Sequence, residues 1–191
     1  MNAQPVRSLD EQRLEFSQSR FLAMPIAGMI AWTIIGISGV FVPVGLAAWI
    51  LFICTGMIFM LGLLIARFTG EDLLGKTRNR NEFDQLFFQS VLMSWLVFAI
   101  AIPFFMTDPT SLPLSVGILA GLMWLPLSWI IKHWVGSFHT FTRTALVTLA
   151  WFVLPEQRYV VIPAIIVVIY LITIYVLANR QLPTQEASFQ T

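Results

Sequence analysis

Six apolar stretches of roughly membrane-spanning length run through this sequence and limit what it can fold into. A bilayer core about 30 Å thick needs about 20 helical residues to cross it. Of the 191 residues, 58% are hydrophobic and 11% are charged, whereas about a quarter of an ordinary soluble domain is charged. We therefore predict an all-α membrane protein with six transmembrane helices. They run from Phe21 to Val40, Val44 to Ala66, Leu86 to Met106, Leu114 to Ile131, Phe141 to Leu154 and Tyr159 to Ala178.

The basic residues predict the orientation of these helices. The fifth stretch is short, and reaches a full span only if its helix begins near Ser137. When it is counted and the amino terminus is cytoplasmic, ten of the 11 lysines and arginines lie inside and only Arg158 lies outside. Because basic residues in short loops favour the cytoplasmic side, both termini are predicted to be cytoplasmic. Residues 1–20 then form a cytoplasmic segment, 21–178 a six-helix transmembrane domain, and 179–191 a cytoplasmic tail.

The amino-terminal segment carries a helix-start signal. Ser8 and Glu11 have the spacing of a capping box, in which each side chain bonds an amide at the helix start. No short apolar core precedes a cleavage site, so a removable signal peptide is not predicted. We expect a short amphipathic helix on the inner membrane surface; the alternative is a solvated tail.

The six stretches also resemble three tandem hairpins. In each odd stretch a small residue precedes a tryptophan, and each even stretch begins near a proline, which is favoured at helix starts. These residues are Trp32, Trp95, Trp151, Pro43, Pro113 and Pro163. Internal duplication is one interpretation, and chance similarity between apolar segments is the other.

The inner loop contains a match to a nucleotide-binding motif. Residues 70–77, GEDLLGKT, fit the Walker A pattern, in which glycine amides wrap a phosphate chain between a strand and a helix. Here an apolar helix precedes the motif, and Glu71 and Asp72 would repel phosphates. We interpret it as a chance match, with glycines ending the second helix. The basic residues Lys76, Arg78 and Arg80 are predicted to face anionic lipid headgroups.

Catalytic and metal-binding signatures are absent from the sequence. It has no H-E-x-x-H or G-x-S-x-G motif, and its single cysteine, Cys54, excludes an internal disulfide and a cysteine zinc cluster. His133 and His139 lack a companion ligand and are expected to be solvated at the interface. We therefore expect no enzymatic activity, metal or cofactor. A net charge of +1 gives no reason to expect nucleic acid as a partner.

No charged residue is expected deep in the predicted spans, and Asp84 and Arg143 are placed at helix mouths. This disfavours an ion-driven pump, because intramembrane charges mark ion pathways. Gln89 is expected to face the bundle, where its amide joins helices or lines a solute cavity. Trp95 and Trp124 lie nearer mid-span, where each indole N–H needs an acceptor.

The fourth stretch is the most informative. Gly117 and Gly121 form a G-x-x-x-G pair that allows close helix packing, and Trp124 and Ser128 continue the same face. Pro126 is expected to kink the helix and to free the carbonyl of Leu122. That carbonyl, the indole and the hydroxyl either form a small ligand site or bond one another.

This segment resembles a family of bacterial six-helix membrane proteins of unknown function. The similarity is carried by Gly121, the run from Met123 to Trp129 and the preceding stretch from Phe83 to Phe105. It covers most of the chain after the amino-terminal segment, and implies the same architecture and a location in the bacterial cytoplasmic membrane. The resemblance implies no activity.

The sequence favours a small membrane transporter or carrier for a neutral or amphiphilic solute, not obviously coupled to an ion. Its predicted ligand contacts are Gln89, Trp95, Trp124 and Ser128, with Gly117, Gly121 and Pro126 as a flexible packing wall. The alternative is a non-catalytic structural or regulatory membrane protein that acts through helix association and its basic inner surface. Expected partners are the lipid bilayer, such a solute and further copies of the chain.

Overall fold

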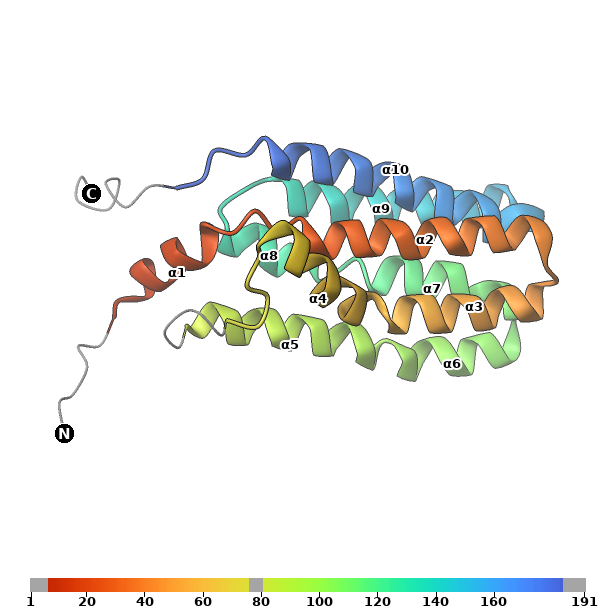
Figure 1. Ribbon diagram of the computed structural model, residues 1–191. Coiled ribbons are helices and arrows are strands. Elements are labelled where there is room, and N and C mark those ends of the chain that lie inside the picture. Colours follow the sequence, from red (N-terminus) through yellow and green to blue (C-terminus); the bar gives the residue numbers. More distant parts are fainter. Residues whose placement is uncertain (1–6, 76–80, 184–191) are drawn as a thin grey trace.

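A computed structural model describes residues 7–75 and 81–183, and within these ranges the chain is all helical, without strands. The predicted all-α class is confirmed. The helices lie side by side in one elongated bundle, with α1 projecting from one end (Figure 1). Their bounds are α1 Leu9–Ser17, α2 Ala23–Phe41, α3 Val44–Gly56, α4 Ile58–Thr69, α5 Glu82–Leu96, α6 Phe98–Thr107, α7 Leu112–Leu119, α8 Trp124–Ile130, α9 Val135–Val153 and α10 Arg158–Ala178.

Four helical segments are long and apolar enough to cross a membrane: Ala23–Phe41, Glu82–Thr107, Pro109–Ile130 and Pro155–Ala178. The pair α3 and α4 qualifies as a fifth span that bends by 48°. Helix α9 has 19 residues but is less apolar and is not among these segments. The number of crossings predicted from the sequence is therefore supported in part.

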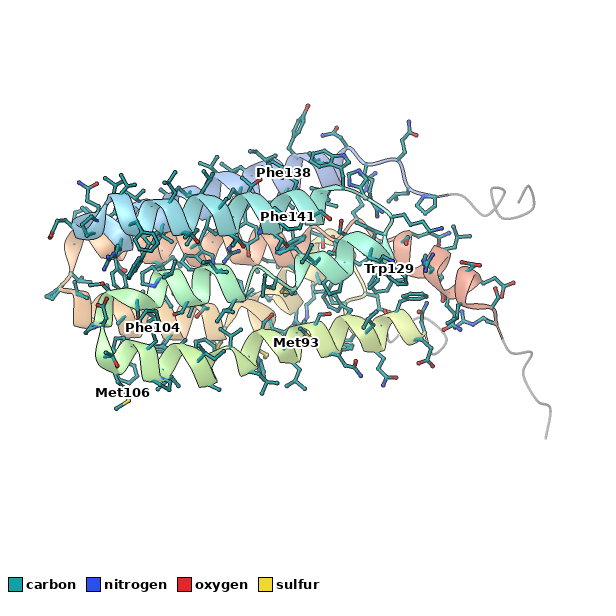
Figure 2. The ribbon with its side chains drawn as sticks, turned by 180° about the vertical axis from the view of Figure 1, so that it is seen from behind. Met93, Phe104, Met106, Trp129, Phe138 and Phe141 are labelled. Atoms are coloured by element: carbon teal, nitrogen blue, oxygen red, sulfur yellow. The ribbon has the colours of Figure 1, made fainter. Side chains whose placement is uncertain are left out.

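Large apolar side chains cover the outside of the bundle. Figure 2 shows Met93, Met106, Trp129 and Phe141 on one such face, and each is more than half exposed. A soluble protein rarely exposes a continuous apolar surface of this kind. This surface and the apolar helices together indicate a membrane protein.

Local signals placed the ends of several elements. The capping box of α1 is present, with the Ser8 hydroxyl accepting from the Glu11 amide and the Glu11 carboxylate accepting from the Ser8 amide. Gly70 ends α4 in the left-handed conformation, with φ of 72°, which glycine adopts without steric cost. The capping box and the glycine-ended second helix are thus confirmed.

The structure supports the predicted pattern of three hairpins less well than it supports these helix ends. Pro163 lies inside α10 rather than at its start, so this part of the predicted pattern is wrong. Trp32 is almost fully buried, whereas Trp95 is half exposed. The two tryptophans therefore occupy different environments.

The first and last described segments meet at one end of the bundle. The Arg180 guanidinium donates to the carbonyls of Ser17 and Ser19 at 2.8 and 2.7 Å, and Arg20 donates to the carbonyl of Ala178. In Figure 1 both ends of the described chain lie on this side.

Candidate functional site

A break between α7 and α8 leaves backbone carbonyls in need of partners. Residues 120–123 form turns rather than continuous α-helix, and the Gly121 amide bonds Ile118 at 2.9 Å instead of Gly117. The Gly117 carbonyl therefore loses its helical donor. A buried carbonyl without a partner is costly, so another element must supply one.

Helix α9 supplies those donors. Arg143 donates from Nε to the Gly117 carbonyl, and the Thr140 hydroxyl donates to the Gly121 carbonyl at 3.1 Å. The absence of a side chain at Gly121 permits this contact, because a Cβ there would lie 2.9 Å from Arg143 Cδ. The polar face of α9 therefore supplies the hydrogen-bond donors that the break between α7 and α8 requires.

The prediction for Pro126 is wrong. The Leu122 carbonyl is not free, since it accepts from the Leu125 amide at 3.1 Å. Pro126 lies in the first turn of α8, where a missing N–H requires no substitute. The helix is interrupted upstream, at residues 120–123. The carbonyl that lacks a helical donor is that of Gly117.

Hydrogen bonds orient His139 beside Arg143. The Thr173 hydroxyl donates to the Ile169 carbonyl at 2.8 Å, so its oxygen accepts from Nδ1 of His139, 2.9 Å away. The other ring nitrogen, Nε2, then turns its lone pair toward Nη1 of Arg143 at 3.4 Å. These contacts assign a neutral histidine that carries its proton on Nδ1.

Three aromatic side chains enclose the pair. The Trp124 ring stacks on His139 with 4.6 Å between centroids, and the Arg143 guanidinium lies 5.3 Å from the centre of the Trp32 ring. The Tyr170 hydroxyl accepts from Arg143 Nη1 at 3.2 Å. The guanidinium thus lies over the rings of Trp32 in α2 and Tyr170 in α10, and Trp124 in α8 covers His139.

The buried positive charge has no acidic partner in the described parts of the chain. Arg143 and His139 are both completely buried, and no ion pair with Arg143 occurs among residues 7–75 and 81–183. Its Nη2 atom lacks a hydrogen-bond partner there. The predictions that Arg143 reaches water at a helix mouth and that His139 is solvated are therefore wrong.

An apolar cavity of about 50 Å³ lies next to this group. It has room for a few water molecules or a short apolar segment. Trp32, Trp124 and Tyr170 form part of its wall, and these are the side chains that contact Arg143 or His139. The cavity and the buried charge are therefore separated by one layer of aromatic rings.

Interrupted helices meet at the level of the cavity. Its wall includes Ile58, which follows the bend between α3 and α4, and Phe98, which follows the interruption between α5 and α6. Ala120 and Met123, at the two ends of the α7–α8 break, also line it. Irregular backbone at membrane depth is tolerated where it is buried in protein or lines a cavity.

One residue of the cavity wall, on α5, also reaches the outer surface of the bundle. Trp95 belongs to its wall and is 50% exposed. Aromatic contacts join α4 to α5 and α3 to α6 nearby, Phe59 with Phe88 at 6.1 Å and Phe52 with Phe98 at 5.7 Å between ring centroids. Trp95 therefore contacts both the cavity and the medium that surrounds the bundle.

The structure distributes the predicted ligand contacts unevenly. Trp95 and Trp124 line the cavity, but Gln89 is exposed on the outer face of α5, and the expectation that it faces the bundle is wrong. Ser128 is buried and bonds the His133 carbonyl and the Ser137 amide and hydroxyl, so it joins α8 to α9.

The remaining predicted residues lie at or beyond the site's edge. At Gly117 a Cβ would lie 3.4 Å from Val147 and from Ile166, which is ordinary van der Waals contact, so the packing of α7 against α9 and α10 does not require glycine at this position. Lys76, Arg78 and Arg80 lie outside the described residues. Glu71, a residue of the Walker A match, has a structural role. Its carboxylate accepts hydrogen bonds from the amides of Leu22 and Ala23 at 2.6 and 3.3 Å and so caps α2.

Sequence reasoning missed Arg143, His139, Thr140 and Tyr170. A signal was available in α9, because His139 and Arg143 are four residues apart and so share one helix face. The pattern was hidden because the predicted apolar stretch starts at Phe141, whereas the helix begins at Val135. That earlier start moves Arg143 from the helix mouth to the middle of α9.

The fold and the site define the class of this protein: an all-helical membrane protein whose interrupted helices surround a small internal cavity. The chain belongs to DUF7010, a family of unknown function, whose model matches residues 9–180. No curated protein and no solved structure matches the chain. The predicted resemblance to a family of unknown function is thereby confirmed at that level.

Proposed function

We propose that this chain is a small integral membrane carrier for a single-chain amphiphilic solute. The observation that carries the proposal is the convergence of three interrupted helical segments on one apolar cavity. In many membrane carriers, discontinuous helices form the substrate site, because their free backbone groups and flexible joints lie together. A bundle selected for stability alone has no need of these interruptions.

The shape of the cavity supports an amphiphilic solute. Its wall is mostly apolar, and the half-exposed Trp95 connects it to the outer surface; we place the entry of the alkyl chain from the lipid there. The cavity is too small for a whole amphiphile, and one wall must therefore move. Segment α5–α6 is the candidate, because only 17% of its most apolar stretch is buried, against 50% for Pro109–Ile130.

The topology belongs to the same proposal. We place six crossings in a bacterial cytoplasmic membrane, with α9 as the fifth and both termini in the cytoplasm. The contacts of Arg180 with Ser17 and Ser19 support an even number of crossings, as does the excess of basic residues on that side. Reporter tags at residues 1 and 191 that appear on opposite membrane faces would overturn this topology.

A transfer assay tests the carrier. Proteoliposomes receive either of two dodecyl chains labelled with a fluorescent nitrobenzoxadiazole group, one with a sulfonate head and one with a maltoside head. Both heads cross a bilayer slowly, and dithionite added outside destroys only the accessible label. We expect the protein to accelerate the transfer of at least one probe over empty liposomes. No acceleration of either probe contradicts the proposal.

A matched pair of variants locates the pathway. Ala120→Phe adds a ring inside the cavity, whereas Ala164→Phe adds the same ring on the exposed face of α10. We expect the first to abolish transfer and the second to leave it unchanged. Equal transfer by both variants favours the alternative of a structural or regulatory protein without a working cavity.

A further inference from the structure

The buried guanidinium of Arg143 lacks a compensating charge in the described structure. It is fully buried, and its contacts there are neutral: the Gly117 carbonyl, the Tyr170 hydroxyl, a ring nitrogen of His139 and the aromatic faces. Buried charges in proteins are normally paired or bound to a ligand, because desolvation of an isolated ion is expensive.

One edge of the guanidinium is free to bind a ligand. Nε is occupied by the Gly117 carbonyl, and Nη1 makes only long contacts of 3.2 and 3.4 Å. Nη2 is buried and has no hydrogen-bond partner in the described residues. The donors of Nη2, together with the Nη1 donor that is released when the Tyr170 contact breaks, would form a fork, the geometry that binds two oxygens of a carboxylate, sulfonate or phosphate group.

The cavity leads to this fork. Trp32 and Tyr170 line the cavity and also contact the guanidinium. A head that reaches the fork through this layer would have to displace the Tyr170 hydroxyl, whose contact with Nη1 is long at 3.2 Å. An anionic head would then replace a hydrogen bond to a neutral hydroxyl with an ion pair, in which donor and acceptor are both charged.

We propose that Arg143 binds the anionic head of the carried solute, with the alkyl chain lying in the cavity beside Trp124 and Trp95. This inference rests on the proposed carrier function. Within it, Trp32 and the Gly117 carbonyl are positioning groups that hold the guanidinium, and His139 fixes its direction through Nε2. The solute class is thereby an anionic single-chain amphiphile rather than a neutral one.

Binding of the two labelled probes to purified protein tests this inference. Each is titrated in a non-ionic detergent, and thermal unfolding is recorded with and without it. We expect the sulfonate probe to bind about tenfold or more tightly than the maltoside probe, and to raise the unfolding midpoint by mass action. If both probes bind with equal affinity and are transferred, the carrier proposal holds and the proposal of an anion site is wrong.

Variants of Arg143 separate recognition from structure. Arg143→Met removes the charge at similar volume and should remove the preference for sulfonate; its unfolding midpoint should fall, because the Gly117 carbonyl loses its donor, so the ratio of the two probe affinities is the readout. Arg67→Met, at an exposed position of α4, is the control and should keep the preference. If Arg143→Met weakens both probes equally and destabilises the protein, Arg143 is structural and the inference is wrong.

Two further arms cover the other outcomes. Arg143→Lys keeps the charge but loses the fork, and should weaken sulfonate binding while folding normally. This variant replaces Arg143→Met in the test if Arg143→Met fails to fold. Unchanged sulfonate binding in Arg143→Lys contradicts the role of the fork. Inorganic sulfate is added as a competitor to the wild-type protein. If free sulfate alone raises the unfolding midpoint as much as the sulfonate probe does, the site takes small inorganic anions and the amphiphile assignment is wrong.

Discussion

The closest approach between α2 and α10 gives the sharpest stability prediction. A Cβ added at Gly39 would lie 2.4 Å from the Tyr159 carbonyl oxygen and 2.7 Å from its carbonyl carbon. Ordinary van der Waals contact begins near 3.4 Å, so Gly39→Ala must separate the two backbones by about 1 Å. Because both sides are backbone within helices or their ends, no side chain can rotate away.

Overpacking of this kind costs about 1–3 kcal/mol, and alanine regains up to about 1 kcal/mol over glycine within a helix. We expect Gly39→Ala to lose about 1–2 kcal/mol of unfolding free energy. For a chain of this size, each kcal/mol shifts the thermal midpoint by about 2–4 °C. The midpoint should therefore fall by about 2–8 °C, measured by tryptophan fluorescence in detergent.

Gly45→Ala is the matched control, since nothing lies within 4 Å of an added Cβ at the start of α3. It should be neutral or gain up to about 1 kcal/mol. If both variants unfold at the same temperature, α2 and α10 do not touch at Gly39 and the packing argument fails. A loss in Gly45→Ala alone would contradict it equally.

Three further changes probe the caps and loops. Glu71→Ala removes the acceptor of the first amides of α2, and should cost about 1 kcal/mol, as other helix-cap losses do. Thr140→Val removes the donor to the Gly121 carbonyl and should cost about 1 kcal/mol in the same unfolding assay. The Thr110 hydroxyl bond lowers the pKa of Asp108 below 3.8, so the stability that this carboxylate contributes should be constant above that pH and decline as pH falls through the lowered value.

Each of these changes has a control within the chain. Glu156→Ala, on an exposed turn, should leave the midpoint unchanged, and an equal loss there would show that charge rather than capping matters at Glu71. Thr148→Val lies on α9 away from the break and should be nearly neutral. Asp108→Asn should abolish the acid decline, and its persistence in that variant would assign the decline to another group.

Hydropathy was sufficient for helices whose apolar run is continuous. The predicted spans from Phe21 to Val40 and from Tyr159 to Ala178 end within two residues of α2 and α10, because charged or turn-forming residues border them. Helix α9 was misplaced because Ser137, His139, Thr140 and Arg143 lower the apolarity of its first half. Hydropathy equates polarity with exposure, whereas these side chains face partners on α7, α8 and α10. The polar residues that form the site therefore lowered the hydropathy of α9, and the sequence did not reveal that they are buried.

The interruptions carry unequal sequence signals, and this limits what could be predicted of the cavity. Gly56 and Gly121 mark two of them, but Val97 has helical backbone angles and no glycine or proline beside it, so the sequence carries no signal for the interruption there.

The position of a residue around α5 then decides whether it meets the cavity. Gln89 and Trp95 are six residues apart, which places them about 120° apart around a helix with 3.6 residues per turn. Both are exposed, but Trp95 also borders the cavity, whereas Gln89 does not line it. Polarity alone favoured Gln89 as the ligand contact. Which face of α5 borders the cavity depends on how α5 packs against its neighbours, and the sequence of α5 by itself does not determine this.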